Sequence, residues 1–198
     1  MLQIASFCRN YMYILKSDDD SLVSINNINE VLSVKKYPTE LLMGYLVCDG
    51  VQGSNRRWWK PHHVYPEEID PWYLTGGVYL MSVSVARKLY RVALSTPIYD
   101  IKDAFITGIC AHKASVKKEH SELFSRKHVL KKACLLRRVC AVFGLTIEEM
   151  RKHYAVLKVY YRMGAICSQP KPFSTVKWFL HTVFMFTSSP YSYRQTCK

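Results

Sequence analysis

The stretch Tyr11-Met12-Tyr13-Ile14-Leu15-Lys16-Ser17-Asp18-Asp19-Asp20 joins an apolar, aromatic run to three consecutive carboxylates. Residues 11–15 are aromatic or bulky apolar side chains, which predicts a buried strand that ends at the charged cluster. Adjacent carboxylates repel one another, and their hard oxygens suit Mg²⁺, Mn²⁺ or Ca²⁺. The stretch therefore predicts either a metal-binding strand end that clamps a diphosphate or a polar turn between two strands.

The composition is that of a folded and basic protein. The 198 residues are 49% hydrophobic and include four Trp and fourteen Tyr, which is enough for a sizeable core and excludes global disorder. The formal net charge of +13 indicates an anionic partner, such as nucleic acid, acidic lipid, or a phosphorylated or sulfated substrate. The seven cysteines show no zinc-ligand spacing and leave the redox compartment open.

The rest of the sequence alternates between patterns typical of strands and of helices. Apolar runs predict strands at 41–48 and 78–81 and an extended continuation at 21–25. Short helices are expected at 28–32 and 101–112. The second of these helices is expected to bury Ala104, Phe105, Ile109 and Cys110. This alternation favours an α/β sheet.

Capping residues mark two further helix starts. Ser84 is expected to cap a helix that ends before Pro97. Thr146 and Glu149 have the spacing of a capping box at the start of another helix. The apolar face of the first helix would hold Val85, Leu89 and Val92, and that of the second Ile147, Met150, Tyr154, Leu157 and Tyr161.

Neither end of the chain predicts a membrane anchor. Residues 1–7 lack the basic start and long apolar stretch of a signal peptide. The longest late apolar patch, 178–186, contains His181 and is far shorter than the roughly 20 residues of a spanning helix. The segment 164–198 is rich in Pro, Ser and Lys, which predicts a poorly determined tail after a domain at 1–163.

Three motifs, in a fixed order, connect these elements to a known family. The first is the strand with Lys16 and the aspartates at 18–20. The second is Arg57-Trp58-Trp59-Lys60-Pro61, then Tyr65-Pro66, then Asp70-Pro71-Trp72-Tyr73-Leu74-Thr75-Gly76-Gly77-Val78-Tyr79-Leu80-Met81-Ser82. The third is Lys102-Asp103-Ala104-Phe105-Ile106-Thr107-Gly108-Ile109. Together they resemble the β1,3-galactosyltransferase-like enzymes of glycosyltransferase family 31, over about residues 1–111 and more weakly to about Tyr154.

The resemblance implies a GT-A fold, which is a Rossmann-like nucleotide-sugar-binding sheet joined to an acceptor-binding half. In the family, nucleotide-binding strands and an N-terminal membrane anchor precede the aspartate strand, which here begins at residue 11. We therefore expect a partial GT-A fold that lacks its first nucleotide-binding strands. The implied activity is inverting transfer of galactose or N-acetylglucosamine from a UDP-sugar to a hydroxyl of a glycan, glycoprotein or glycolipid, with Mn²⁺, in the Golgi.

The resemblance also assigns roles to particular residues. Asp103 would be the catalytic base, although a carboxylate is also favoured at a helix start by the helix dipole. Lys102 stands where the family has Glu, and its charge could lower the pKa of Asp103. Asp18 and Asp20, or Asp20 alone with water and phosphate oxygens, would hold the metal. Donor or acceptor contacts would come from Lys16, Asp19, Trp58, Tyr73, Gly76 and Gly77, although each aromatic side chain could instead belong to the core.

Two features support other functions. The family usually carries a metal-binding His where this chain has Phe143, so the chain could be a catalytically inactive member that acts as a binding or interaction module. The stretch 113–138 holds nine Lys or Arg against two Glu, which could form a nucleic-acid or anionic-glycan patch. No nucleic-acid motif accompanies this charge, so a solvated basic face is favoured and no nucleic-acid partner is expected.

Overall fold

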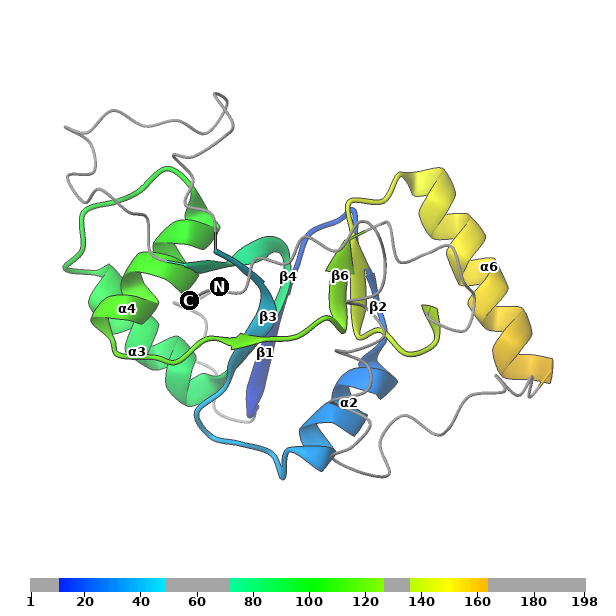
Figure 1. The fold of residues 1–198 in the computed structure, drawn as a ribbon, viewed down its shortest axis with the longest axis horizontal. Helices are drawn as coiled ribbons and strands as arrows, with labels where there is room; N and C mark the ends of the chain where they lie inside the picture. The colour runs from blue at the N-terminus through cyan, green and yellow to red at the C-terminus, as the bar shows by residue number, and fades with distance from the viewer. Residues whose placement is uncertain (1–10, 49–71, 127–135, 164–198) are drawn as a thin grey trace. The chain divides into compact units, whose positions relative to one another are not determined.

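A computed structural model of the chain describes residues 11–48, 72–126 and 136–163 (Figure 1). The fold is mixed α/β, and the chain divides into two compact units. The first unit contains the described residues 11–18, 38–48 and 72–121. The second contains 19–37, 122–126 and 136–163. The tail expected at 164–198 lies outside the described residues.

The first unit is built on a mixed sheet of four described strands. Their order is β1 (Tyr13–Ser17), β4 (Tyr73–Ser82), β3 (Leu42–Val47) and β5 (Glu119–His120). The β1–β4 and β4–β3 pairs are antiparallel, and β3–β5 is parallel. The prediction of an α/β sheet is confirmed, but these strands are not the parallel set of a Rossmann sheet. Parallel neighbours need a long crossover, and only the β3–β5 connection, which contains β4 and several helical turns, provides one among them.

Two of the predicted strands differ from the observed ones in extent. The strand expected at 11–15 lies at Tyr13–Ser17, and its side chains are only partly buried because β1 is at an edge of the sheet. The strand expected at 78–81 is longer, since β4 begins at Tyr73. The strand expected at 41–48 is confirmed as β3.

Helices pack beside the sheet of the first unit (Figure 1). They are α3 (Val83–Ala93), the π-helix η1 (Ala104–Cys110) and α4 (Ala111–Lys113). The core they share with the sheet contains Leu42, Leu74, Tyr79, Met81, Val85, Leu89 and Cys110. The buried face predicted for α3 is confirmed, with Val92 at its partly buried margin.

The cap of α3 differs from the prediction. Strand β4 runs directly into the helix, so α3 begins at Val83 and its cap is Ser82 rather than Ser84. The Ser82 hydroxyl accepts a hydrogen bond from the Val85 N–H at 3.4 Å. The Ser84 hydroxyl instead donates to the carbonyl of Thr39.

The helix expected at 101–112 is present, but most of it is π-helical. The N–H of Ala111 donates to the carbonyl of Ile106, five residues earlier, which is the π-type bond. Of the four side chains predicted to be buried, Phe105 is only partly so. Periodicity alone cannot distinguish this wider turn from an α-helical one.

The second unit has its own mixed sheet and two helices, α2 and α6. The strand order is β2 (Leu22–Val23), β7 (Ala141–Phe143) and β6 (Phe124–Arg126), with β2–β7 antiparallel and β6–β7 parallel. The helix expected at 28–32 is longer, since α2 spans Ile25–Val34 and begins at the cap residue Ser24.

The capping box at the start of α6 (Ile147–Met163) is confirmed. The Thr146 N–H donates to the Glu149 carboxylate at 2.9 Å, and the Glu149 N–H donates to the Thr146 hydroxyl at 3.3 Å. The predicted apolar face is only partly right. Met150 and Leu157 pack on the core, whereas Ile147 and Tyr154 are 66% and 61% exposed, because they lie at the flanks of that stripe. Within the described residues, no helix has both the length and the apolarity needed to span a membrane.

Asn27 ties α2 to the segment that leads into β7. Its side chain is buried, and its amide donates to the carbonyls of Arg137 at 2.8 Å and Val139 at 2.7 Å. These two bonds satisfy acceptors 110 and 112 residues away in the sequence. A single side chain therefore joins both chain segments of the second unit.

We expect Asn27→Ala to lower the free energy of unfolding by about 1–3 kcal/mol, because it removes the donor to the buried Val139 carbonyl and to the partly buried Arg137 carbonyl. Chemical denaturation checks this value. Asn29→Ala, at an exposed position of the same helix, is the matched control and should leave stability unchanged or slightly higher, since Ala favours the helix. Equal stability of the two variants would contradict the role of Asn27.

Candidate functional site

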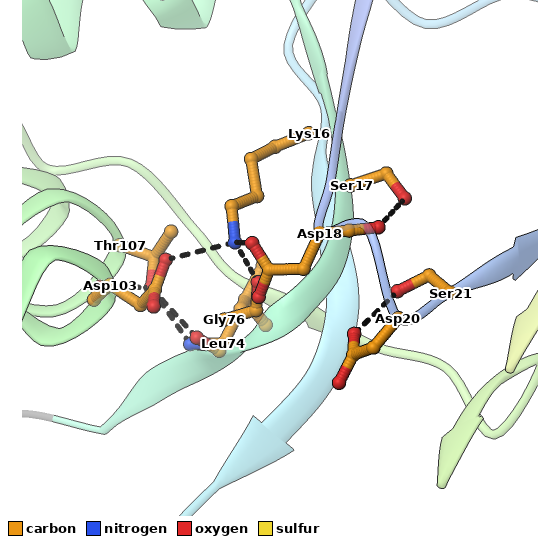
Figure 2. A network of polar contacts seen from close by, with 9 residues as sticks. All are labelled: Lys16, Ser17, Asp18, Asp20, Ser21, Leu74, Gly76, Asp103 and Thr107. Carbon is orange, nitrogen blue, oxygen red and sulfur yellow. Dashed lines mark hydrogen bonds and ion pairs between the residues drawn. The ribbon is translucent and has the colours of Figure 1, made fainter. Parts of the chain in front are cut away.

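The ammonium group of Lys16 joins residues from three separate parts of the first unit (Figure 2). Its Nζ lies 2.6 Å from Asp18 Oδ1 and 3.8 Å from Asp103 Oδ1, and it also donates to the carbonyl of Gly76. Lys16 and Asp18 come from the end of β1, Gly76 lies in β4, and Asp103 immediately precedes η1. The structure thus brings together four of the predicted site residues.

The pairing of β1 with β4 explains how Lys16 reaches Gly76. Lys16 lies opposite Tyr79 in this antiparallel pair, and the pairing continues past the strand end, where the Asp18 N–H donates to the Gly77 carbonyl at 3.0 Å. The Nζ of Lys16 lies 5.8 Å from the centre of the Tyr79 ring, within the range of a cation–π contact. The ammonium group is therefore held by an aromatic face as well as by oxygen atoms.

Tyr79 was not predicted as a site residue, although it belongs to the second motif. Its side chain is buried. Burial raises the pKa of Tyr79, and the nearby charges of Asp103 and Asp18 raise it further. These effects favour the neutral form of Tyr79, whose ring contacts the Lys16 ammonium group.

Gly76 allows the Asp103 carboxylate to lie directly against strand β4. A Cβ placed on Gly76 would lie 2.5 Å from Asp103 Cγ and would overlap its Oδ2 atom. The φ angle of Gly76 is not in the left-handed region, so the glycine is needed here for space rather than for backbone conformation. Any other residue at this position would push Asp103 away from the strand.

The Asp103 carboxylate is only 24% exposed, and burial is the largest influence on its acidity. Burial raises the pKa of Asp103. The charge of Lys16 opposes this increase, Asp18 adds to it, and Lys102 has a smaller opposing effect. The predicted effect of Lys102 is confirmed in direction, because its charge lowers the pKa of Asp103, but burial outweighs it and the pKa of Asp103 is raised overall. A raised pKa makes the carboxylate a better proton acceptor.

The aspartate motif is shared between the two units. Asp18 belongs to the first unit, and Asp19 and Asp20 belong to the second. Within the second unit, Asp20 Oδ1 accepts a hydrogen bond from the Ser21 hydroxyl at 3.3 Å, and the Asp20 carbonyl accepts one from the Leu145 N–H at 3.0 Å (Figure 2). The boundary between the two units therefore falls within the aspartate motif.

The carboxylates of the aspartate motif are of the kind that binds a divalent ion together with oxygen atoms of a bound ligand. Asp18 and Asp20 supply hard carboxylate oxygens, and their Cα atoms can be at most about 7 Å apart along the chain. In the described part of the chain, no group of three or more His, Cys, Asp or Glu side chains forms a complete metal site. Carboxylate oxygens of this kind bind divalent ions together with water and phosphate oxygens.

Within the described part of the chain, the other residues predicted for the site are not among those that contact the Lys16 ammonium group. Tyr73 packs beside Tyr99, Ala104 and Ile109, which favours its interpretation as a core residue. Trp58 lies outside the described residues. Phe143 is buried in β7 of the second unit. Asp19 is exposed.

Comparison with known proteins connects this geometry to a family. The sequence pattern of the galactosyltransferase family matches residues 1–122. Beta-1,3-galactosyltransferase 1 of Homo sapiens is 27% identical over 155 residues, which cover 77% of this chain and 47% of the relative. Beta-1,3-galactosyltransferase 9 of Homo sapiens is 31% identical over 155 residues, which cover 76% of this chain and 40% of the relative.

A third relative gives a similar result. Beta-1,3-galactosyltransferase 5 of Homo sapiens is 26% identical over 157 residues, covering 77% of this chain and 50% of the relative. The chain therefore spans about half the length of the curated relatives it matches. Because the family pattern covers well over half of its residues, including both Lys16 and Asp103, the chain belongs to the galactosyltransferase family.

Proposed function

We propose that this chain is part of a hexosyltransferase that moves galactose or N-acetylglucosamine from a UDP-sugar to a hydroxyl group of a glycan, glycoprotein or glycolipid. Family membership supports the nucleotide-sugar donor and the glycan acceptor. The single observation that carries the proposal is the position of Asp103, whose carboxylate lies beside Gly76 and shares Lys16 with Asp18. A candidate base and a candidate metal ligand thus meet at one ammonium group.

In the proposed reaction, the Asp103 carboxylate takes the proton of the acceptor hydroxyl. The hydroxyl oxygen then forms a bond to the anomeric carbon, and the bond from that carbon to the diphosphate oxygen breaks, so that UDP leaves with the electron pair. Attack from the side opposite UDP inverts the anomeric centre. The raised pKa of Asp103 suits this role, because the base must accept a proton at neutral pH.

Asp18 and Asp20 are the residues that would hold Mn²⁺ or a similar divalent ion. When bound, such an ion neutralises the charge that develops on the departing diphosphate. Lys16 donates to Asp18 and so adds a fixed positive charge beside the same carboxylate. The side chain of Asp18 is 50% exposed, which leaves it accessible to a ligand from solvent.

The family also supports a GT-A type of fold, here in partial form. The chain's mixed α/β sheets are compatible with that architecture. The proposed location is the lumen of the Golgi, with membrane attachment through an N-terminal anchor that is not among the described helices.

A second candidate function is that of a catalytically inactive family member that binds a partner or a glycan. It is favoured by Phe143, which resemblance to the family aligns with a metal-binding His. Phe143 is buried and cannot coordinate a cation. The two functions differ in whether a divalent ion strengthens UDP binding.

We expect Asp103→Asn to lower sugar transfer by on the order of 10²-fold or more, because it removes the proton acceptor and conserves the shape of the side chain. UDP binding should be retained. The measurement is release of UDP from UDP-galactose and UDP-N-acetylglucosamine in the presence of a panel of oligosaccharide acceptors. Asp100→Asn, at an exposed position nearby, is the matched control and should transfer at the wild-type rate. Full activity of Asp103→Asn would rule out this residue as the base.

We also expect Mn²⁺ to increase the stabilisation of the protein by UDP. At a ligand concentration of 100 Kd this stabilisation amounts to about 2.7 kcal/mol. Thermal unfolding with UDP, with and without Mn²⁺, should show a rise in Tm that is lost in Asp18→Asn and Asp20→Asn and is retained in Asp100→Asn. A rise that does not depend on Mn²⁺ in the wild type would favour the inactive binding module.

A further inference from the structure

We propose that Thr107 is a positioning residue that holds Asp103 in place for proton transfer, an inference that rests on the proposed function. Thr107 lies in η1, four residues after Asp103, and its side chain is fully buried, with 0% exposure. Nothing in the motif assigns it a role. Its hydroxyl nevertheless makes hydrogen bonds to both sides of the candidate site (Figure 2).

The hydroxyl of Thr107 connects strand β4 to the residue that carries the base. The Leu74 N–H donates to Thr107 Oγ1 at 2.9 Å, and the hydroxyl donates to the carbonyl oxygen of Asp103 at 2.7 Å. The Leu74 carbonyl is a longer alternative acceptor, at 3.3 Å. Leu74 is two residues before Gly76 in the same strand. A single hydroxyl group therefore links strand β4, two residues before Gly76, to the backbone of Asp103.

The backbone N–H of Leu74 depends on this hydroxyl for structural reasons. Leu74 is fully buried, and a buried backbone N–H needs an acceptor. In the π-helix, backbone bonds shift towards carbonyls five residues earlier, as between Ala111 and Ile106. At Asp103, the Thr107 side chain supplies a bond from four residues onward. A valine of the same shape would remove both hydrogen bonds and keep the packing.

Asp103 lies close to Gly76, and the hydrogen bonds of Thr107 therefore matter for the proposed reaction. The Asp103 carboxylate is in van der Waals contact with the strand, so a small shift of the turn would move it relative to Lys16 and to an acceptor hydroxyl. Misplacement of a reacting group by about 1 Å can cost on the order of 10²-fold in rate. Thr107 would act on the rate through Asp103 and would not touch the substrate.

The test compares Thr107→Val with Thr107→Ser in the full chain, using UDP-galactose and UDP-N-acetylglucosamine with the same oligosaccharide acceptors. We expect Thr107→Val to lower kcat on the order of 10- to 100-fold without a change in the KM for the donor. Thr107→Ser keeps the hydroxyl and should recover most of the rate. Hydrogen exchange at the Leu74 amide should be faster in Thr107→Val and close to wild type in Thr107→Ser.

Thr96→Val is the matched control. Thr96 is another buried threonine of the first unit, and its hydroxyl donates to the carbonyl of Val92 at 2.8 Å, away from Asp103. This variant should lose stability and keep its kcat. If Thr107→Val does not fold, Thr107→Ala, which leaves room for a water molecule, replaces it with the same expected loss of kcat.

Three results would overturn the inference. The first is a wild-type kcat in Thr107→Val together with accelerated exchange at Leu74. The second is an equal loss of kcat in Thr107→Val and Thr96→Val, which would mean that stability alone sets the rate. The third is the absence of transfer by the wild type with a protected Leu74 amide, which would remove the proposed function and the positioning role of Thr107 with it. The rate of hydrogen exchange at the Leu74 amide distinguishes the third result from the first.

Discussion

The contact between the Asp103 carboxylate and the backbone of Gly76 is the constraint on which the candidate site depends. It exists only because position 76 has no side chain, and it places a partly buried carboxylate within reach of Lys16. Pairing of β1 with β4 delivers Lys16 and Asp18 to the same place, and Tyr79 supports the ammonium group from the core. Burial then raises the pKa of Asp103 despite two nearby cations. Burial therefore affects the pKa of this carboxylate more than the nearby charges do.

The boundary between the two units also falls within the aspartate motif, between Asp18 and Asp19. Asp18 is fixed to the first unit through the Gly77 carbonyl, and Asp20 is fixed to the second through the Leu145 N–H. Asp18 and Asp20 are therefore positioned by hydrogen bonds to different parts of the chain.

Much of this arrangement could be predicted from the sequence, and the parts that could not depend on tertiary contacts. The apolar run of β3, the buried face of α3 and the capping box of α6 follow from local patterns. The sequence also predicted that Asp103 and the aspartate motif belong to one site, by resemblance to a family. It could not predict that Ser82 caps α3, since that depends on where β4 ends, nor that burial raises the pKa of Asp103. The π-helical turn leaves no distinct signal in the periodicity, and the hydrogen bond between Leu74 and Thr107 joins residues 33 positions apart, which no single-sequence pattern records.

The most direct test of the account is the cost of Gly76→Ala in two backgrounds, measured as the free energy of unfolding. In the wild-type background, the new methyl group should overlap the Asp103 carboxylate and cost about 1–3 kcal/mol. In an Asp103→Ala background, the same change should cost nothing or stabilise slightly, because alanine restricts the unfolded chain and the overlap is gone. An equal cost in both backgrounds would contradict the close contact between Gly76 and Asp103, and with it the site described above.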